Sequence, residues 1–321
     1  MTGRVGVRCD AGAGRGVGHL VRCVALAEEL RGRGVEVGFL GDLAGSAWAR
    51  AQLLARGLPL VPAPADPERL AELVRDLRLD VVVLDSYDLA PGTGARIRAT
   101  GAAVLAIVDG DPLGQEADLY LDQNLGAELR PFPLLAERLA GVRYALLRDS
   151  VRRLRRAPGP RGEVPRVLCF FGGTDSAGVT SAWAGALNAT GLPFRATVVS
   201  PRLFAVEGPI TVIPPTDRLP QLMAEADLVL TAAGSTIWEL LYLGVPAALT
   251  WVAANQLIGY EALAAGGIAA ALGPDPGQAA VEVLARLLGD AGLREEYGRR
   301  GSGLVDGKGR ERVADVLLSL R

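Results

Sequence analysis

Short apolar runs alternate with longer amphipathic segments along almost the whole chain, and this alternation limits the fold more than any other feature. It is typical of βα units, because parallel strands are joined through crossover helices. Residues 80–84 (Asp-Val-Val-Val-Leu) and 103–108 are almost continuously apolar, as strands buried on both faces of a parallel sheet are. The sequence therefore predicts an α/β protein with parallel sheets.

The alternation starts twice. A strand predicted at Arg4–Arg8 leads into a glycine-rich loop and a helix near His19, and a strand at Arg166–Phe171 again leads into a glycine turn. Between them, Arg152–Pro165 is rich in Arg, Pro and Gly and has almost no apolar periodicity, which is typical of a linker. The pattern predicts two doubly wound, Rossmann-like domains whose strand ends face each other across a cleft.

Domain boundaries follow from the same pattern. We expect an N-terminal domain over 1–155 and a C-terminal domain over 156–321, since domains average about 150 residues. The last helix, near Arg310–Leu320, carries an apolar stripe and is a candidate to pack back on the N-terminal domain. Further strands are expected at 35–40, 58–61 and 228–231, and helices at 46–55, 67–77 and 237–243.

Composition excludes several classes of protein. Half of the residues are hydrophobic and 22% are charged, which allows a sizeable core and excludes wholesale disorder. The 34 basic and 36 acidic side chains leave a net charge of -2, so no global positive field attracts nucleic acid. The longest uncharged run, 240–260, is interrupted by Gly244, Pro246, Asn255 and Gln256. It fits a helix end, a strand and a helix start better than a membrane span.

The cysteines and the N-terminus point to a reducing cytoplasm. Cys9, Cys23 and Cys169 form an odd set without a C-x-x-C pair, which argues against a disulfide framework and against a zinc site. The first residues lack the apolar stretch of a signal peptide. We therefore expect a cytoplasmic protein with free, buried thiols.

His19 is the single histidine of the chain. It follows the first predicted strand and the loop Ala11–Gly16, at the start of a helix whose free N–H groups favour negative charge. Since histidine side chains titrate near neutrality, His19 is a candidate general base. The alternative is an ordinary helix residue that faces solvent.

Polar segments of the second half lie at predicted strand ends or helix starts. Gly234-Ser235-Thr236 could bind phosphate through backbone N–H and hydroxyl groups, or simply cap a helix. Glu239, one turn later, could accept the ribose hydroxyls of a nucleotide or complete a capping box. Gly172-Gly173-Thr174-Asp175 permits close approach of a ligand but equally a tight turn. Asn255-Gln256 are sugar ligands or caps.

Acidic residues follow two strands of the first half, in Asp85-Ser86-Tyr87 and Asp109-Gly110-Asp111. Paired carboxylates there could hold a metal, although aspartates in such positions are more often turn and cap residues. Neither a Walker loop nor a complete G-x-G-x-x-G fingerprint is present. We therefore expect no metal and no cofactor.

The motifs form a recognisable set when they are taken together. In the first half they are Arg8-Cys9-Asp10, Gly18-His19-Leu20-Val21-Arg22-Cys23, Asp85-Ser86-Tyr87, Asp122-Gln123-Asn124 and Tyr144-Ala145-Leu146-Leu147-Arg148. In the second half they are Phe171-Gly172-Gly173-Thr174-Asp175, Gly234-Ser235-Thr236-Ile237-Trp238-Glu239, Gly244-Val245-Pro246 and Asn255-Gln256. This set resembles the UDP-sugar hydrolases of the pseudaminic acid pathway and the related spore-coat polysaccharide proteins, which have the GT-B glycosyltransferase architecture. It covers most of the chain in one order, whereas the second-half motifs alone are shared by many GT-B enzymes.

The resemblance implies that the second domain binds UDP, with the diphosphate near Gly234–Thr236 and the ribose on Glu239. The first domain would supply His19 as general base, with Tyr87 and Asp10 on the sugar side, and Asn255 would reach in from the second. Water would attack the anomeric carbon with inversion and without a metal, releasing UDP. The remaining residues expected to bind substrate or nucleotide are Gly18, Arg22, Gly172, Gly173, Thr174, Asp175, Ser235 and Gln256.

Two alternatives stay open at this stage. A transferase of the same fold would use a hydroxyl of a small molecule or polysaccharide in place of water. A non-catalytic subunit that binds a nucleotide sugar would need no base, and the presence of His19 argues against it. Ala232-Ala233 precede Gly234 where similar sites often have further glycines, so the nucleotide stays open, as does the sugar.

Overall fold

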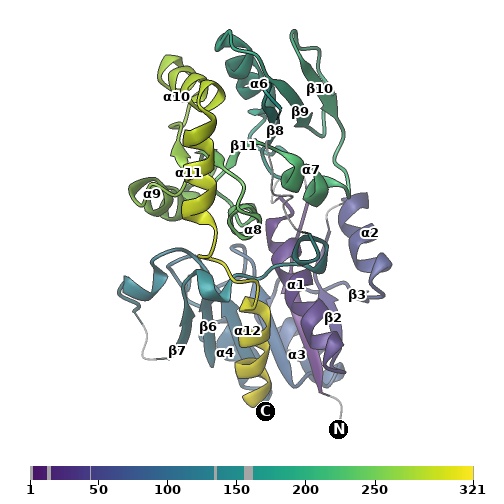
Figure 1. Cartoon of the computed structure of the whole chain (residues 1–321). Coiled ribbons are helices and arrows are strands. Elements are labelled where there is room, and N and C mark those ends of the chain that lie inside the picture. The colour runs from purple at the N-terminus through teal and green to yellow at the C-terminus, as the bar shows by residue number, and fades with distance from the viewer. Residues whose placement is uncertain (1–2, 13–15, 44, 134–135, 155–161, 321) are drawn as a thin grey trace. The chain divides into compact units, whose positions relative to one another are not determined.

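The computed structural model describes residues 3–12, 16–43, 45–133, 136–154 and 162–320 (Figure 1). The chain divides into two compact units, Met1–Arg148 with Gly307–Arg321 (unit 1) and Asp149–Asp306 (unit 2). Each unit is a parallel sheet with helices, so the predicted α/β class with two Rossmann-like sheets is confirmed. The division after Arg148 comes before the predicted boundary at 155, and residues 155–161 of the predicted linker lie outside the described residues.

Unit 1 alternates strands and helices. Its strands are β1 (Arg4–Cys9), β2 (Glu36–Leu40), β3 (Leu60–Val61), β4 (Val81–Asp85), β5 (Ala103–Ile107), β6 (Leu119–Asp122) and β7 (Glu137–Ala140). Its helices are α1 (Gly18–Gly32), α2 (Ala47–Ala55), α3 (Pro67–Asp76), α4 (Thr93–Arg98) and α12 (Gly309–Ser319), with short 3-10 turns η1 (Ala127–Leu129) and η2 (Val142–Tyr144). The strands and helices predicted for this half therefore exist, with ends shifted by one or two residues.

The sheet of unit 1 has the order β3-β2-β1-β4-β5-β6-β7, with neighbouring strands parallel. The strands are added outward from β1 on one side and from β4 on the other, so the winding reverses between these two. Cys9 is the register partner of Asp85 at this point, where both strands end. Ligands of doubly wound folds bind beside such a reversal, at the carboxyl ends of the strands.

Helices bury apolar side chains on both faces of this sheet. Leu30 of α1 and Leu317 of α12 belong to the core of one face, and Leu70 of α3 and Ile97 of α4 belong to the core of the other. The helix α12, yellow in Figure 1, packs on α1 within unit 1. The second compact unit therefore ends at Asp306 rather than at 321, and the last helix packs in unit 1, as its apolar stripe made it a candidate to do.

Unit 2 has the same kind of sheet, in the order β10-β9-β8-β11-β12-β13 with neighbouring strands parallel. Its strands are β8 (Arg166–Phe170), β9 (Arg195–Val199), β10 (Ile210–Ile213), β11 (Leu228–Ala232), β12 (Ala247–Thr250) and β13 (Ala270–Ala271). Its helices are α5 (Asp149–Arg152), α6 (Thr180–Ala189), α7 (Leu219–Glu225), α8 (Thr236–Leu243), α9 (Leu257–Ala265), α10 (Gln278–Gly289) and α11 (Ala291–Gly301), with the 3-10 turn η3 (Ala254–Gln256).

The winding of unit 2 reverses between β8 and β11. Phe170 and Thr231 are register partners there, near the carboxyl ends of the two strands. The glycine turn after β8 and the Gly234–Thr236 segment after β11 thus leave neighbouring strands at the same edge of the sheet. The uncharged run 240–260 contains the end of α8, then β12, then the start of α9, as the sequence predicts.

Candidate active site

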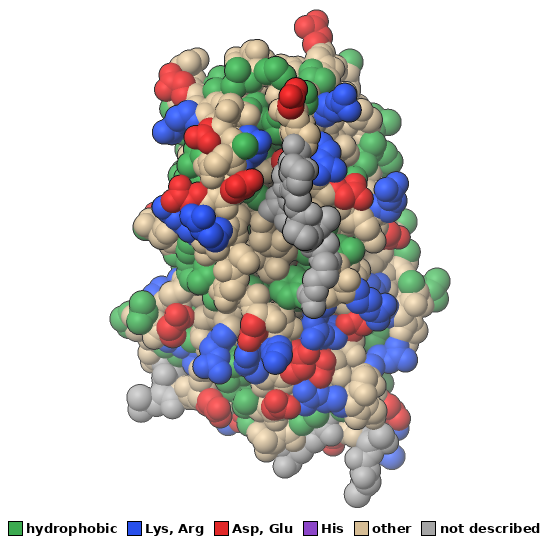
Figure 2. Space-filling view, viewed as in Figure 1, with side chains coloured by type: hydrophobic (Ala, Val, Ile, Leu, Met, Phe, Trp, Pro, Cys, Tyr) green, Lys and Arg blue, Asp and Glu red, His purple; other side chains and the backbone are tan. Residues whose placement is uncertain are grey.

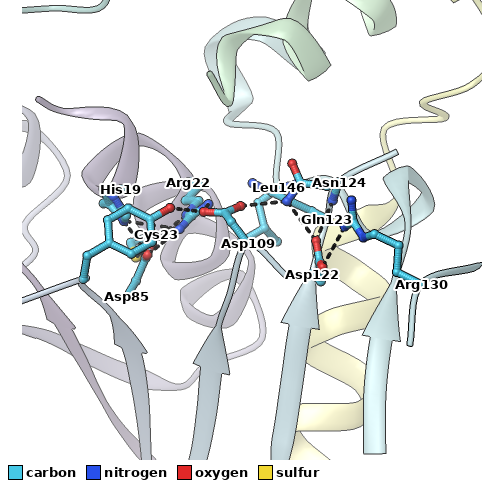
Figure 3. A network of polar contacts seen from close by, with 11 residues as sticks. His19, Arg22, Cys23, Asp85, Asp109, Asp122, Gln123, Asn124, Arg130 and Leu146 are labelled. Carbon is cyan, nitrogen blue, oxygen red and sulfur yellow. Dashed lines mark hydrogen bonds and ion pairs between the residues drawn. The ribbon is translucent and has the colours of Figure 1, made fainter. Parts of the chain in front are cut away.

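Three buried or part-buried carboxylates gather at the carboxyl edge of the unit 1 sheet (Figure 3). Asp85 is the last residue of β4, Asp122 is the last residue of β6, and Asp109 follows the end of β5. Because β4, β5 and β6 are parallel neighbours, their ends meet along one edge. Buried carboxylates remain charged only when cations and hydrogen-bond donors surround them, and the contacts below supply both.

His19, the second residue of α1, contacts the first of these carboxylates. Its Nδ1 atom lies 2.5 Å from Oδ1 of Asp85, whose side chain is fully buried. Burial alone would raise the pKa of Asp85. The charges of Arg22 and His19 and the hydrogen bonds from both residues instead hold that pKa well below its usual range. Asp85 is therefore ionised and can only accept hydrogen bonds.

The ionised state of Asp85 decides which nitrogen of His19 carries the proton in the neutral ring. A carboxylate cannot donate, so Nδ1 must hold the hydrogen and donate it to Asp85. Nη2 of Arg22 also lies 3.2 Å from Nδ1, but this is a contact between two donors rather than a hydrogen bond. The lone pair of the imidazole is therefore on Nε2, which is the arrangement of a base held by an acidic partner.

Arg22, one turn further along α1, is the shared counter-charge of two carboxylates. Its Nε and Nη2 atoms donate to Asp85 at 2.7 and 2.6 Å, and its Nη1 lies 3.5 Å from Oδ2 of Asp109. Burial alone would lower the pKa of Arg22, but the charges of Asp85 and Asp109 raise it above its usual range. Arg22 was predicted to bind substrate, and the structure places its guanidinium in internal ion pairs.

Tyr87 lies beside His19 and is anchored to the second carboxylate. Its hydroxyl donates to Oδ2 of Asp109, and its ring meets the His19 ring edge-on, with centroids 4.8 Å apart. Burial and the charge of Asp109 raise the pKa of Tyr87 well above its usual value. Burial would raise the pKa of Asp109 too, but the charge of Arg22 and hydrogen bonds from Tyr87 and Asn124 lower it.

Asn124 extends the network to the third carboxylate. Its Nδ2 atom lies 2.8 Å from Oδ1 of Asp109 and 2.8 Å from Oδ1 of Asp122. Nη2 of Arg130 donates to the other oxygen of Asp122 at 2.9 Å. Gln123 lies between Asp122 and Asn124 in sequence, and its Oε1 accepts a hydrogen bond from the backbone N–H of Leu146 at 3.0 Å. The Asp122-Gln123-Asn124 motif thus ties the ends of β5 and β6 to the segment that follows η2.

The predicted free thiols are confirmed, and one of them belongs to the network. Cys9, Cys23 and Cys169 are buried, and no disulfide joins them. Sγ of Cys23 lies 3.2 Å from Oδ2 of Asp85, to which the thiol donates. Burial raises the pKa of Cys23 well above its usual value, so the thiol stays protonated as a donor.

Asp10, predicted on the sugar side, is buried at the end of β1. Its Oδ1 atom lies 2.7 Å from Nη1 of Arg8 and accepts the backbone N–H of Asp42 at 2.9 Å. These contacts hold the loops after β1 and β2 together. Residues 13–15 of the glycine-rich loop predicted before His19 lie outside the described residues, and Gly18 begins α1.

The Gly234–Thr236 segment lies at the start of α8 in unit 2. Ser235 occupies the N-cap position, but its side chain makes no capping hydrogen bond, so the simple capping interpretation is not what the structure shows. A Cβ atom on Gly234 would lie 3.7 Å from Nε2 of Gln256. The fold therefore brings Gln256, predicted on the nucleotide side, next to Gly234, while its Oε1 accepts the N–H of Val252.

Asp175 of the glycine turn accepts hydrogen bonds at the start of a helix. Its carboxylate accepts the backbone N–H groups of Val179 and Thr180 at 3.0 and 3.4 Å, at the start of α6. Gly172 has a φ of +72°, a left-handed conformation that favours glycine. Gly173 and Thr174 lie between these two residues in the turn after β8. The turn thus leaves the sheet edge with its backbone partly exposed.

Glu239 and Asn255 differ in exposure. Glu239 is only 2% exposed on α8 and has interaction partners within the chain. Asn255 lies in η3 on the surface. Whether either contacts a ligand stays a prediction.

In the described part of the chain, no group of His, Cys, Asp and Glu side chains is arranged to hold a metal ion. The carboxylate of Asp111 accepts the N–H of Leu113, as expected of a turn residue. No helix among these residues is long and apolar enough to cross a membrane. Figure 2 shows acidic and basic side chains interspersed over the face that it draws, without a large patch of one sign.

Sequence reasoning missed the pairing within the unit 1 network. The sequence alone indicates metal ligands or turn residues at Asp85 and Asp109, and it marks Asn124 only as part of a motif. The available signal was positional, because acidic residues follow successive apolar strands and such strand ends share one edge when the strands are parallel. Strand order was needed to say which of them meets His19.

Comparisons with known proteins address the fold. No family model matches the chain. An uncharacterised protein of Methanocaldococcus jannaschii is 23% identical over 266 residues, which is 76% of this chain and 54% of that protein. The chain thus spans about half the length of this curated relative.

Solved structures match over almost the whole chain. MurG of Acinetobacter baumannii has a TM-score of 0.70 and 17% identity, covering 99% of both chains. The glycosyltransferase SnogD of Streptomyces nogalater has a TM-score of 0.65 and 20% identity, covering 100% of both. The fold is that of the GT-B glycosyltransferases. The glycosyltransferase SsfS6 of Streptomyces sp. SF2575, in complex with thymidine diphosphate, has a TM-score of 0.60 and 15% identity, covering 99% of both chains.

Proposed function

We propose that the protein is an enzyme that cleaves the bond between a sugar and a nucleoside diphosphate, with His19 as general base. The observation that carries this proposal is the 2.5 Å contact between Nδ1 of His19 and the buried, ionised Asp85. It directs the basic lone pair of Nε2 away from Asp85, where it can take the proton of an attacking hydroxyl. The negative charge of Asp85 then stabilises the imidazolium that forms.

The second part of the proposal assigns the nucleotide to unit 2. The diphosphate would lie on the N-terminus of α8, where the first backbone N–H groups of a helix favour an anion. Gln256 lies beside Gly234 and would contact the same ligand, and Glu239 would accept the ribose hydroxyls. SsfS6 shares the fold and binds thymidine diphosphate, which supports a nucleoside diphosphate here too.

The comparisons favour transfer of the sugar to an acceptor hydroxyl. The solved structures that share the fold over the whole chain include glycosyltransferases such as SnogD and SsfS6. In this reaction the acceptor oxygen gives its proton to Nε2 of His19, forms a bond to the anomeric carbon and displaces the nucleoside diphosphate.

Hydrolysis is the second candidate, and the ordered motifs of the sequence favour it. The segments around His19, Tyr87 and Asn124 resemble those of UDP-sugar hydrolases, and the structure joins all three to one network. Water would then be the nucleophile and the free sugar the product, with Asp10 and Asn255 as sugar-side residues. We place the reaction in the cytoplasm, where nucleotide sugars are substrates, and we propose that it needs no metal.

Incubation in oxygen-18 water tests both candidates. The enzyme is given a panel of UDP- and TDP-linked amino sugars with and without candidate acceptors. Release of nucleotide only with an acceptor supports the transferase, and release without one, with label on the sugar, supports the hydrolase. Label on the phosphate would mean attack at phosphorus and would overturn the mechanism. If the protein bound a nucleotide sugar tightly but turned none over, it would be a non-catalytic binding subunit.

The protonation state of His19 can be measured without a substrate. Because the chain has a single histidine, nitrogen-15 labelling of histidine gives the signals of one ring. We expect the Nδ1–H tautomer in the neutral wild-type protein and a loss of that preference in Asp85→Asn. The Nε2–H tautomer in the wild type would contradict the role given to His19.

A further inference from the structure

We infer that Asp109 is a positioning residue that makes the Tyr87 hydroxyl a hydrogen-bond acceptor for an O–H or N–H group of the ligand beside His19. The inference deepens the proposed function and rests on it. Neither the motifs nor the fold comparisons assign a role to Asp109.

The direction of the Tyr87–Asp109 hydrogen bond carries the argument. Asp109 is held ionised by Arg22 and by the amide of Asn124, whose Nδ2 lies 2.8 Å from its Oδ1. An ionised carboxylate only accepts, so the single hydroxyl proton of Tyr87 must point at Oδ2. Any further partner of the phenolic oxygen must then be a donor.

The position of Tyr87 indicates what that partner is. The residue is 40% exposed, and its ring contacts the His19 ring edge-on. A ligand held at Nε2 of His19 therefore meets the phenol as well. Sugar hydroxyls and acetamido N–H groups can donate to the phenolic oxygen, whereas carboxylate and phosphate oxygens would face a lone pair. Tyr87 thus selects ligands with a donor group at this position.

The direction of the bond can be tested in the protein without ligand, by tyrosinate absorbance during a pH titration. An ordinary tyrosine is about 90% ionised at pH 11. Because burial and the charge of Asp109 both oppose loss of the phenolic proton, Tyr87 should remain protonated at that pH. Tyr87→Phe should therefore leave the absorbance change up to pH 11 as in the wild type. The chain has six tyrosines. If Tyr87→Phe lowered the absorbance change up to pH 11 by the contribution of one tyrosine, the inference would be overturned.

A second variant tests the role of Asp109. Asp109→Asn leaves the burial of Tyr87 in place but removes the charge that also opposes its ionisation, so Tyr87 should titrate at a lower pH than in the wild type. This difference should vanish in the Tyr87→Phe, Asp109→Asn double variant. Asp111→Asn is the matched control, because Asp111 lies on the same loop and its carboxylate accepts only a turn N–H among the hydrogen bonds described. An equal change in the tyrosine titration of this control, or no change in Asp109→Asn, would contradict a specific Tyr87–Asp109 pair.

Turnover of the nucleotide sugar identified by the labelling experiment gives the functional readout. One neutral hydrogen bond corresponds to about a 3- to 10-fold change, so we expect kcat/KM to fall by this factor in Tyr87→Phe. Asp109→Asn should cost far less in the Tyr87→Phe background than in the wild type, because it acts through the phenol. If the losses in kcat/KM from Tyr87→Phe and Asp109→Asn were additive in the double variant, Asp109 would not act through Tyr87. If no nucleotide sugar is turned over, the proposed function fails, while the titration still decides the Tyr87–Asp109 pair.

Discussion

The sheets of units 1 and 2 have the same kind of topology, but different chemical groups follow the strands at their carboxyl edges. In unit 1, the strands on either side of the reversal lead to charged side chains, and Asp85 is held by His19 and Arg22. In unit 2, the corresponding strands lead to Gly172 and Gly234, where backbone groups and small hydroxyls dominate. Topology thus decides where each site lies, and the residues after the strands decide whether the site is suited to proton transfer or to anion binding.

The two edges also differ in how their groups are held. The carboxylates of unit 1 are oriented by ion pairs and hydrogen bonds between residues far apart in sequence, such as His19 and Asp85. The segment at the start of α8 depends on local backbone geometry, and Gly234 accepts an added Cβ without a clash. Substitutions in unit 1 should therefore affect catalysis, and those in unit 2 should affect nucleotide binding.

The largest expected effect is on turnover, from His19→Asn. Loss of a general base lowers turnover by about 100-fold or more, while UDP affinity should stay nearly unchanged because the proposed nucleotide contacts lie in unit 2. Steady-state kinetics and calorimetric titration of UDP measure the two quantities. Equal losses in both, or a misfolded variant, would mean that His19 is structural and would remove the contrast between the units.

A smaller effect on affinity is expected from Glu239→Ala. A carboxylate that accepts both ribose hydroxyls contributes about 1.5–3 kcal/mol, so UDP should bind about 10- to 150-fold more weakly. Dideoxy-UDP, which lacks both hydroxyls, should bind the wild type and the variant alike. If the variant still prefers UDP over this analogue to the same degree as the wild type, Glu239 is a structural residue of α8.

Gly234→Ala should weaken nucleotide binding without affecting stability. The added Cβ meets Nε2 of Gln256 at an ordinary 3.7 Å, so the melting temperature should not change. A methyl group that keeps a phosphate from the backbone should cost about 10-fold in UDP affinity. Gly185→Ala is the control, since an added Cβ there meets nothing within 4 Å. Unchanged UDP affinity in Gly234→Ala would place the diphosphate elsewhere.

The smallest effect concerns stability at low pH. Asp85 and Asp109 have lowered pKa values in the folded protein, so their stabilising contribution is present above about pH 4, the unfolded value, and is lost as the pH falls toward the folded values. Each contributes a slope of about 1.4 kcal/mol per pH unit in that range. Urea unfolding at pH 5 and pH 3 should show a smaller decrease in Asp85→Asn than in the wild type. The same decrease in both would contradict the ionised state assigned to Asp85.

Much of the fold could be predicted because its signals are local. The apolar runs predicted at 80–84 and 103–108 form strands at 81–85 and 103–107, and the helix predicted at 67–77 begins at Pro67. The restart at Arg166 is the first strand of the second sheet. Periodicity and capping depend on neighbouring residues, so one sequence suffices to read them. The placement of His19 at the start of α1 was predictable for the same reason.

The partners of His19 and the place of the last helix were decided by the tertiary structure. Asp85 and Asp109 stand 66 and 90 positions after His19, and they reach one network only because β4 follows β1 in the sheet and β5 follows β4. The apolar stripe of α12 shows that one face is buried but not against which unit, since burial favours any apolar surface without regard to direction. The sequence by itself determined the elements, the glycine turns and the candidate base. Strand order and packing, which depend on contacts between distant residues, determined which side chains meet.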